Sequence, residues 1–481
     1  MYRRVQSTDA PRLRRRRYAS QRGILMTLLI AAVAVPGIAA EEIDLETAVA
    51  LALESNLGLE GELQNVMQKK LIADTWWNRF YPSISARATM ARTNEEQEVS
   101  GIAPVPESAV IGPSGPTGAF DYVAPFSSEA PRWNLSTALD MRLDLTLQMV
   151  PGIRLAKLDY EAGLITMQEA RRKVERDVTK QFYQLLLLKE QIELVRQQID
   201  AAEGRYEQAL LNYENGLADE YTMLSARVAW ENQKPQLTGL EVQYQQQLLT
   251  FRNDLGVSLT RDLEPVGEID PPNLTFTLQE ITRELLEQRL DVQQLEFVGT
   301  ILEQQYFLTD SNRAPVVSFG WSYDPSFEGD PWEDDLFDGD SWGQRSGAFT
   351  ITITQPLDPW LPYSRLRNEL ASVRREQERN RIQRQQALAG AEIEVRSLIR
   401  ATRAAEQTVG ALEFNIDLAE RAYELAEIGY ENGLRDLLEV QNAEVELQSA
   451  RFELLKQRKQ IMDNLLDLEF ALNTTIDEIA D

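Results

Sequence analysis

The sequence contains neither cysteine nor histidine in its 481 residues. Without cysteine the chain can form no disulfide, and it has no thiolate to serve as a nucleophile, a metal ligand or a lipid attachment site. Without histidine it lacks the commonest general base and the commonest zinc ligand. We therefore expect no catalytic residues, no cofactor and no metal site, and we do not expect an enzyme.

Basic residues and long apolar runs are also scarce. The chain carries 49 Lys and Arg against 76 Asp and Glu, which gives a formal net charge of -27. A chain this acidic repels the phosphate backbone of nucleic acid, so no nucleic-acid partner is expected. It attracts cations or the basic surfaces of partner proteins. Outside the N-terminus, no apolar run approaches the length of a membrane-spanning helix.

Residues 1–40 have the pattern of a secretory signal peptide. A basic region ends at Arg22, an apolar run covers 24–35, and the small residues Ala39 and Ala40 precede an acidic start. The alternative is a single membrane anchor, but the apolar run is short for a span of about 20 residues. The pattern predicts export from the cytoplasm.

One passage of the chain occurs twice. The sequence YENGL at 213–217 returns at 430–434, an offset of 217 residues, and the same offset joins two longer sets of residues without a gap. The first set is Leu188, Ile192, Val195, Ile199, Ala202, Tyr206, Ala209 and Tyr213. The second set is Ala405, Val409, Leu412, Ile416, Ala419, Tyr423, Ala426 and Tyr430. The chain is therefore an internal duplication.

Both sets alternate spacings of four and three residues, which is the apolar seam of a coiled coil sustained for about four heptads. Each seam ends at Asn-Gly, and both residue types tolerate the positive φ that a tight reversal needs. A second helical run follows each reversal. The sequence predicts two long helical hairpins, with helices at 155–214 and 218–255 and at 361–431 and 434–472.

The predicted tips of these hairpins are Asn215, Gly216 and Leu217 in the first copy and Asn432, Gly433 and Leu434 in the second. Pro235 lies inside the first return helix and should kink it. The hairpin pattern alone fits an ordinary intracellular coiled coil equally well.

Each half also contains a shorter helical segment, at 44–79 and at 278–312, followed by two segments that alternate in polarity. In the first half the apolar positions of these segments are Ile84, Ala86, Ala88 and Met90, then Leu139, Met141, Leu143, Leu145, Leu147 and Met149. In the second half they are Val317, Phe319, Trp321 and Tyr323, then Phe349, Ile351 and Ile353. The pattern predicts two strands of about ten residues per half, the length of a tilted membrane-spanning strand.

Four strands cannot close a barrel, and an open sheet edge cannot lie in lipid. If these strands span a membrane, several copies of the chain must share one barrel. Trp321, Tyr323 and Phe349 then fit the aromatic belt at the membrane interface. They fit equally well as packing residues of a soluble sheet.

Two loops separate the strands of each pair. The first, at 93–134, is rich in Gly, Pro and Ser, and the second, at 324–343, is acidic. Its clustered carboxylates could bind calcium. Their spacing fits no twelve-residue calcium loop, so a solvated outer loop is the favoured interpretation.

This order of parts resembles the outer membrane efflux protein family, the channel-tunnels typified by TolC. A signal peptide is followed by a helix, a strand, a long loop, a strand and a long hairpin, all but the first duplicated, and the resemblance covers about 43–473. It implies a homotrimer in which four strands per chain close one outer-membrane β-barrel. The helices would form a coiled-coil α-barrel in the periplasm, and the hairpin tips would meet a periplasmic adaptor protein and an inner-membrane pump.

The resemblance also implies a gate. In the family, a Tyr and an Arg beside the last hairpin turn help to hold the tip closed, and Tyr430 and Arg435 stand at those positions. Family members narrow the pore with acidic residues just after the turn. Glu439 occupies the first such place, whereas Asn442 and Thr222 stand where further acids can occur. Without the resemblance, Glu439 also fits a surface helix charge, and Tyr430 fits a packing residue of the seam.

These observations predict a mixed α and β membrane protein of the cell outer membrane with a periplasmic extension. Its function is an exit duct of a tripartite efflux or type I secretion system. The alternative is an exported coiled-coil periplasmic adaptor or scaffold without a pore, which would have no use for lipid-length strands. The expected divisions are a signal peptide (1–40), a first structural repeat (41–257), a linker (258–277), a second structural repeat (278–473) and a C-terminal tail (474–481).

Overall fold

The computed structural model describes residues 41–94, 98–104, 123–129, 133–272, 283–328, 342 and 346–474. The predicted signal peptide lies outside the described residues, as do nearly all of the predicted C-terminal tail and most of the acidic loop.

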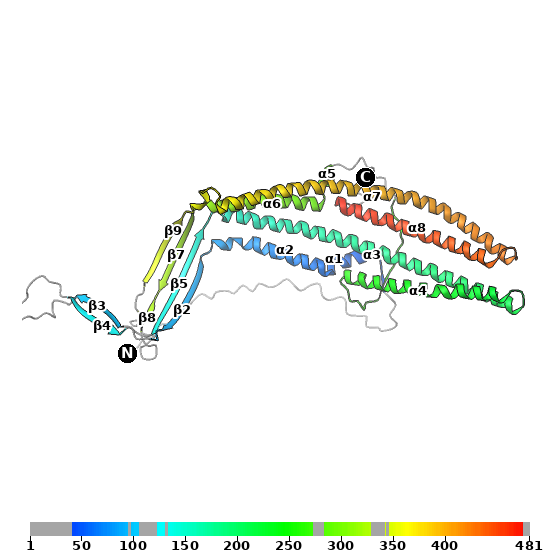
Figure 1. The fold of residues 1–481 in the computed structure, drawn as a ribbon, viewed down its shortest axis with the longest axis horizontal. Coiled ribbons are helices and arrows are strands. Elements are labelled where there is room, and N and C mark those ends of the chain that lie inside the picture. Colours follow the sequence, from blue (N-terminus) through cyan, green and yellow to red (C-terminus); the bar gives the residue numbers. More distant parts are fainter. Residues whose placement is uncertain are drawn as a thin grey trace, which may run out of the picture.

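Two long helical hairpins form the body of the molecule (Figure 1). The first consists of α3 (Met149–Glu214) and α4 (Glu220–Asp254). The second consists of α7 (Arg365–Glu431) and α8 (Leu437–Leu472), and this confirms the hairpins that the heptads predict. At about 1.5 Å per residue, helices of 66 and 67 residues are rods of about 100 Å. α4 runs through Pro235 without an interruption.

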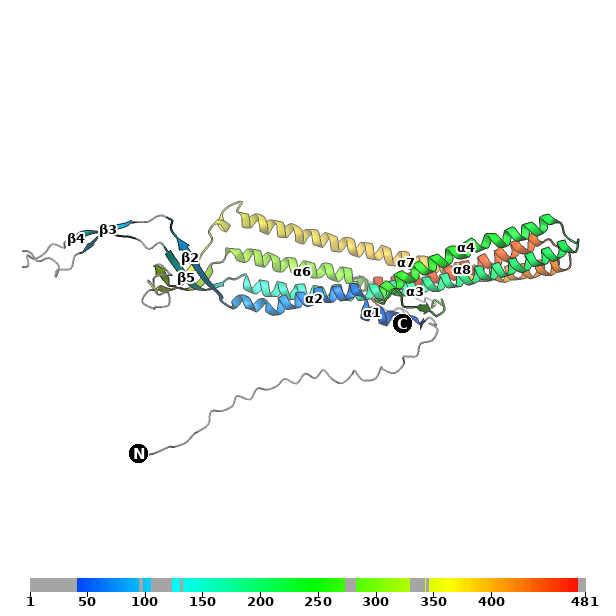
Figure 2. The same ribbon diagram turned by 90° about the horizontal axis from the view of Figure 1, so that it is seen from below.

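Four short helices extend these hairpins toward the strands: α1 (Leu45–Ser55), α2 (Leu57–Thr75), α5 (Arg283–Glu287) and α6 (Leu290–Asp310). Figure 1 shows α2 and α1 in line with α4, and α6 in line with α8. Figure 2 shows that α7, α6, α3 and α2 lie side by side near the strands, where neighbouring pairs are in contact. Near the tips, α3 instead contacts α4 and α8.

The junction of α1, α2 and α4 is built around Asn56. Its side chain accepts a hydrogen bond from Leu59 N at 3.1 Å and donates one to the backbone oxygen of Asp254 at 2.7 Å. Gly256 follows with a φ of +70°, and a Cβ at this position would lie 1.9 Å from the backbone oxygen of Ser55. Only glycine fits so close an approach at that φ. The predicted helical segment at 44–79 is thus divided into α1 and α2, which are joined where they meet the end of α4.

The sheet has four long antiparallel strands in the order β2 (Ser83–Arg92), β5 (Trp133–Leu145), β7 (Val316–Asp324) and β9 (Ser346–Thr354). The short strand β8 (Ser326–Glu328) pairs with β5. Among the described strands, β2 and β9 each pair on one side only, so the sheet is not closed within one chain. This confirms the four long strands that alternating polarity predicts.

The register of the sheet separates an apolar face from a polar face. Ile84, Met141, Trp321 and Phe349 are aligned in one row across the four strands. The neighbouring row is Ser83, Arg142, Gly320 and Thr350. Because successive side chains of a strand point to opposite faces, these two rows lie on opposite faces of the sheet. One face therefore suits a lipid environment and the other suits water.

Two pairs of strands were not expected from the sequence. β3 (Glu98–Pro104) and β4 (Val123–Glu129) pair within the predicted loop at 93–134. β1 (Glu41–Ile43) pairs in parallel with β6 (Leu263–Pro265), which lies in the predicted linker. These strands are short and show no alternation, so the sequence pattern does not reveal them.

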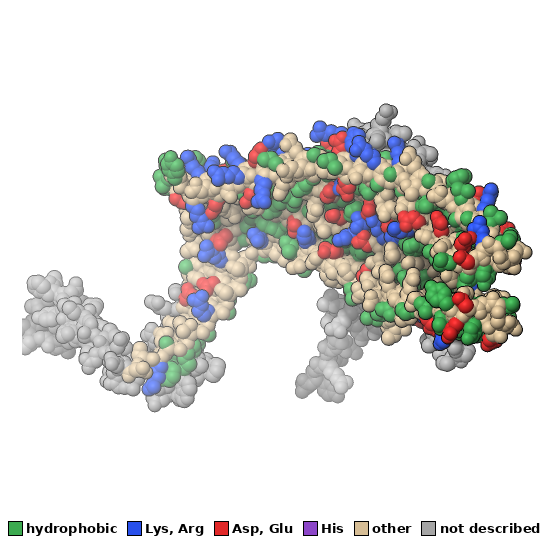
Figure 3. All heavy atoms as spheres, turned by 45° about the vertical axis from the view of Figure 1, so that its right-hand side comes forward, with side chains coloured by type: hydrophobic (Ala, Val, Ile, Leu, Met, Phe, Trp, Pro, Cys, Tyr) green, Lys and Arg blue, Asp and Glu red, His purple; other side chains and the backbone are tan. Residues whose placement is uncertain are grey.

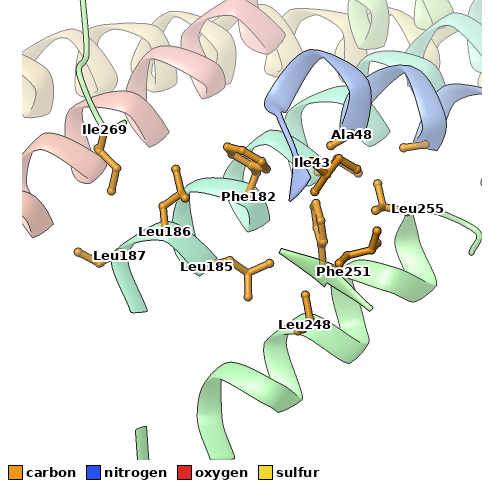
Figure 4. Packing of buried hydrophobic residues seen from close by; sticks show 13 residues of the cluster. Ile43, Ala48, Phe182, Leu185, Leu186, Leu187, Leu248, Phe251, Leu255 and Ile269 are labelled. Atoms are coloured by element: carbon orange, nitrogen blue, oxygen red, sulfur yellow. The ribbon is translucent and has the colours of Figure 1, made fainter. Parts of the chain in front are cut away.

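The largest core lies midway along the body, where β1 and β6 pack against the hairpin formed by α3 and α4 (Figure 4). The rings of Phe182 and Phe251 have centroids 6.4 Å apart, and Ile43 points toward them. Burial of each such side chain stabilises the fold by about 1.5–3 kcal/mol. This core holds α1, β1 and β6 against the first hairpin, and Phe452 and Leu455 of α8 pack against its edge. None of the helices in the described part of the chain is long and apolar enough to cross a membrane.

Candidate gate and docking site at the hairpin tips

The first hairpin tip is a tight helix-terminating turn. The N–H of Leu217 donates to the backbone oxygen of Asn212 at 2.7 Å, and the N–H of Gly216 donates to that of Tyr213 at 2.9 Å. Gly216 has a φ of +71°, as the glycine of this turn requires. The Asn215 side chain also donates to the backbone oxygen of Leu211 at 2.7 Å, so few carbonyl groups at the helix end remain unpaired.

The second tip repeats this geometry. The N–H of Leu434 donates to the backbone oxygen of Gly429 at 2.8 Å, Gly433 has a φ of +71°, and the Asn432 side chain donates to that of Ile428 at 2.7 Å. Asp436 caps the start of α8, because its side chain accepts a hydrogen bond from the N–H of Glu439 at 2.9 Å. Identical turn residues therefore produce two turns with matching hydrogen bonds.

Both tips project into solvent. Leu217 is 79% exposed and Leu434 is 83% exposed. Figure 3 shows hydrophobic and acidic side chains together at this end of the molecule. Burial of an exposed leucine side chain against a partner protein removes apolar surface from water, which is favourable. The geometry thus allows the six predicted tip residues to meet a partner.

The three predicted gate residues occupy two different surroundings. Arg435 Nη1 lies 3.2 Å from Glu439 Oε2, and both side chains are about half exposed. The stem of Arg435 lies along Gly429, where a Cβ would be 2.9 Å from its Cγ and Cδ. Tyr430 instead packs against a small buried cluster that includes Ala209 of the first hairpin. The structure therefore joins Arg435 to Glu439 and turns Tyr430 toward the other hairpin.

Thr222 and Asn442 stand at the positions where the resemblance to the family predicts further acidic residues. The Thr222 hydroxyl donates to Asp219 Oδ1 at 2.5 Å, so this side chain completes the N-terminal cap of α4. Asn442 is exposed. In the described part of the chain, no group of three or more acidic side chains is arranged to hold a metal ion.

Sequence reasoning missed an ion pair that joins the two hairpins near their tips. Arg205 of α3 pairs with Glu444 of α8, and their side chains are only 12% and 9% exposed. Burial raises the pKa of Glu444, and Arg205 offsets part of this rise because its positive charge favours the carboxylate. Glu427 lies close enough to add to the rise.

Tyr423 belongs to the same group, because its hydroxyl donates to Glu427 Oε1 at 3.2 Å. Its pKa is raised, first by burial and then by the negative charges of Glu427 and Glu444. A signal in the sequence could have found this group. In the other copy, Ala422 occupies the position of Arg205 and Arg227 occupies the position of Glu444, so neither member of the ion pair is repeated.

The fold combines a four-stranded antiparallel sheet with a long helical extension that ends in two hairpin tips. The family model described as "Outer membrane efflux protein" matches residues 49–257 and 281–474. The chain belongs to this family. No curated protein matches it at a significant level.

Several solved structures share the fold. CusC has a TM-score of 0.68 at 15% identity, over 89% of this chain and 91% of CusC. The CmeC outer membrane channel of Campylobacter jejuni has a TM-score of 0.70 at 16% identity, over 89% of this chain and 85% of CmeC. The MtrE outer membrane channel of Neisseria gonorrhoeae, in its open state, has a TM-score of 0.64 at 17% identity, over 90% and 89% of the two chains.

Family membership confirms the predicted efflux function. The protein is an outer membrane efflux channel of the kind that works in tripartite efflux systems, with a periplasmic extension. Proteins of this family are transport channels and not enzymes. The alternative of a scaffold without a pore therefore gives way to the channel.

Proposed function

We propose that three copies of the chain form one channel, with their sheets joined edge to edge in a closed outer-membrane barrel. The observation that carries this proposal is the sheet with one apolar face and two edges, β2 and β9, that pair with no further strand among the described residues. An open edge in lipid leaves backbone groups without hydrogen bonds, each at a cost of several kcal/mol. Pairing of β9 in one copy with β2 in the next removes this cost.

The duplication divides each protomer into two structural repeats, 41–257 and 278–473, joined by a linker at 258–277. A signal peptide at 1–40 would direct export, and 474–481 would form a short tail. Two hairpins per chain give six hairpins per trimer, which is enough to surround a central duct. The separate matches of the family model to the two halves support this division.

At the tips, Tyr430, Arg435 and Glu439 form a periplasmic gate. Three copies of Glu439 around one axis would make a ring of carboxylates, and such a ring favours cations. Arg435 lies 3.2 Å from that carboxylate, so each positive charge weakens the ring while the pair is intact. The gate opens when the second hairpin moves away from the first, a change that a partner can bias.

The exposed tip residues Asn215, Gly216, Leu217, Asn432, Gly433 and Leu434 dock a periplasmic adaptor protein, which links the channel to an inner-membrane pump. This arrangement would pass solutes from the pump to the exterior. If the adaptor bound at the tips belongs to an ATP-driven exporter, the cargo is protein instead. The exposure of Leu217 and Leu434 supports this surface.

Adjacent residues of β9 test the sheet orientation, because the chain has no cysteine of its own. Phe349→Cys should lie in lipid, and Thr350→Cys should line the water-filled duct. In membranes, a water-soluble maleimide should label Thr350→Cys at least tenfold faster than Phe349→Cys. Equal labelling would refute a lipid-facing apolar side, and native mass spectrometry that finds only single chains would refute the trimer.

The docking surface has a separate test. A photo-crosslinker on Asn432→Cys should capture an adaptor protein in cells, whereas the same reagent on Gln386→Cys, exposed in the first third of α7 and far from the tip, should capture much less of it. Capture of only soluble proteins from outside the cell envelope would contradict the adaptor surface.

A further inference from the structure

A hollow of about 560 Å³ lies between the first turns of α3 and the last turns of α6. Its wall includes Leu147, two residues beyond the end of β5, and Ala314, two residues before the start of β7. The hollow therefore lies where the sheet ends and the helical body begins. Its volume is within the range of small-molecule sites.

The hollow opens on the side of the molecule that continues the apolar face of the sheet. A second hollow on the opposite side of α3 and α6 is lined by Ser83, Arg142 and Asp144, which belong to the polar face. The two hollows use different positions of α6, such as Leu308 on the polar side and Phe307 on the apolar side. We name the hollow on the apolar side the rim groove.

The wall of the rim groove combines exposed apolar side chains with arginines. The side chains of Leu147, Val150 and Phe307 are each more than half exposed. Exposed large apolar side chains that lie together mark a surface that contacts another protein, a ligand or a membrane. Arg154 and Arg313 lie in the same wall. An apolar surface with basic residues at its border is the chemistry that binds anionic lipids.

Polar groups of the rim groove remain without partners. Among the described residues, Gln304 Oε1 and Arg313 Nε are buried and have no hydrogen-bond partner. Arg313 pairs with Asp310 at 3.2 Å through Nη1, so part of its charge is already balanced. Arg154 is exposed and makes no ion pair within the described part of the chain. The groove thus keeps one uncompensated positive charge and an acceptor for a hydroxyl group.

We propose that the rim groove binds an anionic glycerophospholipid, such as phosphatidylglycerol, from the periplasmic leaflet of the outer membrane. The phosphate would lie between Arg154 and Arg313, and the glycerol hydroxyls would reach Gln304. The acyl chains would run from Leu147 and Phe307 along the apolar face of the sheet. This proposal rests on the lipid-facing orientation proposed above.

The location of the groove favours a lipid over a soluble phosphate ester. A soluble ligand gains nothing from Leu147, Val150 and Phe307, whereas lipid chains cover them. One chain supplies the whole groove, since α3 and α6 are neighbours within a protomer. Binding at this place would hold the start of α3 at a fixed depth in the membrane.

Native mass spectrometry of the delipidated full-length protein in detergent tests the proposal. Phosphatidylglycerol and phosphatidylcholine with the same acyl chains are added separately. The wild type should bind phosphatidylglycerol at least fivefold more tightly. Arg154→Gln should lower this affinity about fivefold, the effect of one basic residue near an anionic headgroup. The double variant R154Q/R313Q should remove the preference, and Arg154→Lys should retain it.

Arg79→Gln is the matched control, because Arg79 lines the hollow on the polar side. Arg79→Gln removes one positive charge near the same junction of sheet and helices, and it should leave the preference for phosphatidylglycerol unchanged. An unchanged preference in R154Q/R313Q, or an equal loss in Arg79→Gln, would overturn the proposal. So would displacement of the lipid by an equal concentration of glycerol 3-phosphate, since the site would then bind soluble phosphate esters.

The same spectra report the number of chains in each complex, so failure of the trimer and failure of the lipid site are distinguishable. A preference for phosphatidylglycerol on single chains would support the groove and contradict the trimer. Trimers without any preference would support the channel and contradict the groove.

Discussion

The buried pair of Arg205 and Glu444 makes a sharp prediction about what holds the two hairpins together. Removal of one partner from a buried ion pair leaves the other charge unpaired, at a cost of about 3–5 kcal/mol, whereas replacement of both by apolar groups is often neutral. The two side chains are 12% and 9% exposed, so solvent screens them little. We expect Glu444→Leu to cost about 3 kcal/mol of unfolding free energy.

Arg205→Met should cost less than Glu444→Leu. A carboxyl that loses its partner can bind a proton, and protonation of an ordinary Glu at neutral pH costs about 3.5 kcal/mol, because each pKa unit corresponds to about 1.4 kcal/mol. Burial already raises the pKa of Glu444, so its protonation costs less than that. An arginine has no such escape, because it stays charged in proteins. The double variant R205M/E444L should be close to the wild type.

Denaturant titration of the four proteins at neutral pH measures this double-mutant cycle. The coupling energy between the two substitutions should exceed about 1 kcal/mol, which is larger than the deviation from additivity that independent sites show. Arg421→Met is the matched control, since Arg421 pairs with Asp417 on an exposed surface and such pairs contribute about 1 kcal/mol at most. Additive losses in the double variant, or a larger loss for Arg205→Met than for Glu444→Leu, would refute this reasoning.

Titration gives a second measurement on the same carboxyl. The pKa of Glu444 in the folded protein lies above its ordinary value of 4.5, so the folded state binds the proton more tightly than the unfolded state. Stability therefore falls as pH rises from the ordinary pKa through the folded pKa, and it is highest below both. Glu444→Gln should lack this fall. If the difference in unfolding free energy between the wild type and Glu444→Gln did not change over this interval, Glu444 would have no raised pKa.

Three further changes test the turns and the proposed gate. Gly429→Ala should displace the Arg435 side chain and lower the melting temperature. Gly410→Ala, where a Cβ has open space, should raise the melting temperature slightly, because alanine favours a helix by up to about 1 kcal/mol. Equal effects of the two substitutions would contradict the contact between Gly429 and Arg435. Gly256→Ala should cost more than about 2 kcal/mol in denaturant titration, because its φ is +70° and a Cβ would clash with backbone; a neutral result would refute the tight junction. Glu439→Gln should lower the cation preference of single channels in planar bilayers, and an unchanged reversal potential would remove Glu439 from the gate.

The parts that the sequence predicts well are those with local causes. The hairpin tips follow from Asn-Gly at the end of a heptad seam, where Gly216 and Gly433 adopt the positive φ that the turn needs. The long strands follow from alternation over about ten residues. In each case the residues that specify the element lie within it, so the pattern is visible without knowledge of the fold.

The parts that the sequence does not predict depend on distant partners. The break at Asn56 is stabilised by a bond to Asp254. β1 is three residues long, and its partner β6 lies on the far side of the first hairpin in the sequence. Arg205 and Glu444 meet only because α3 and α8 are neighbours in the bundle. No periodicity in a single segment carries this information.

Divergence between the two copies is nevertheless readable, and it points to the proposed gate. Both tips share one turn geometry, because the turn residues are the same. The residues around the turns differ: Arg435 and Glu439 of the second copy correspond to Ala218 and Thr222 of the first. A residue that occurs in both copies is explained by a structural role that the copies share. A charged residue that occurs in a single copy needs a separate reason. The charges unique to the second hairpin therefore favour a gate built on that hairpin, and the Arg205 and Glu444 pair connects it to a first hairpin that keeps the same shape.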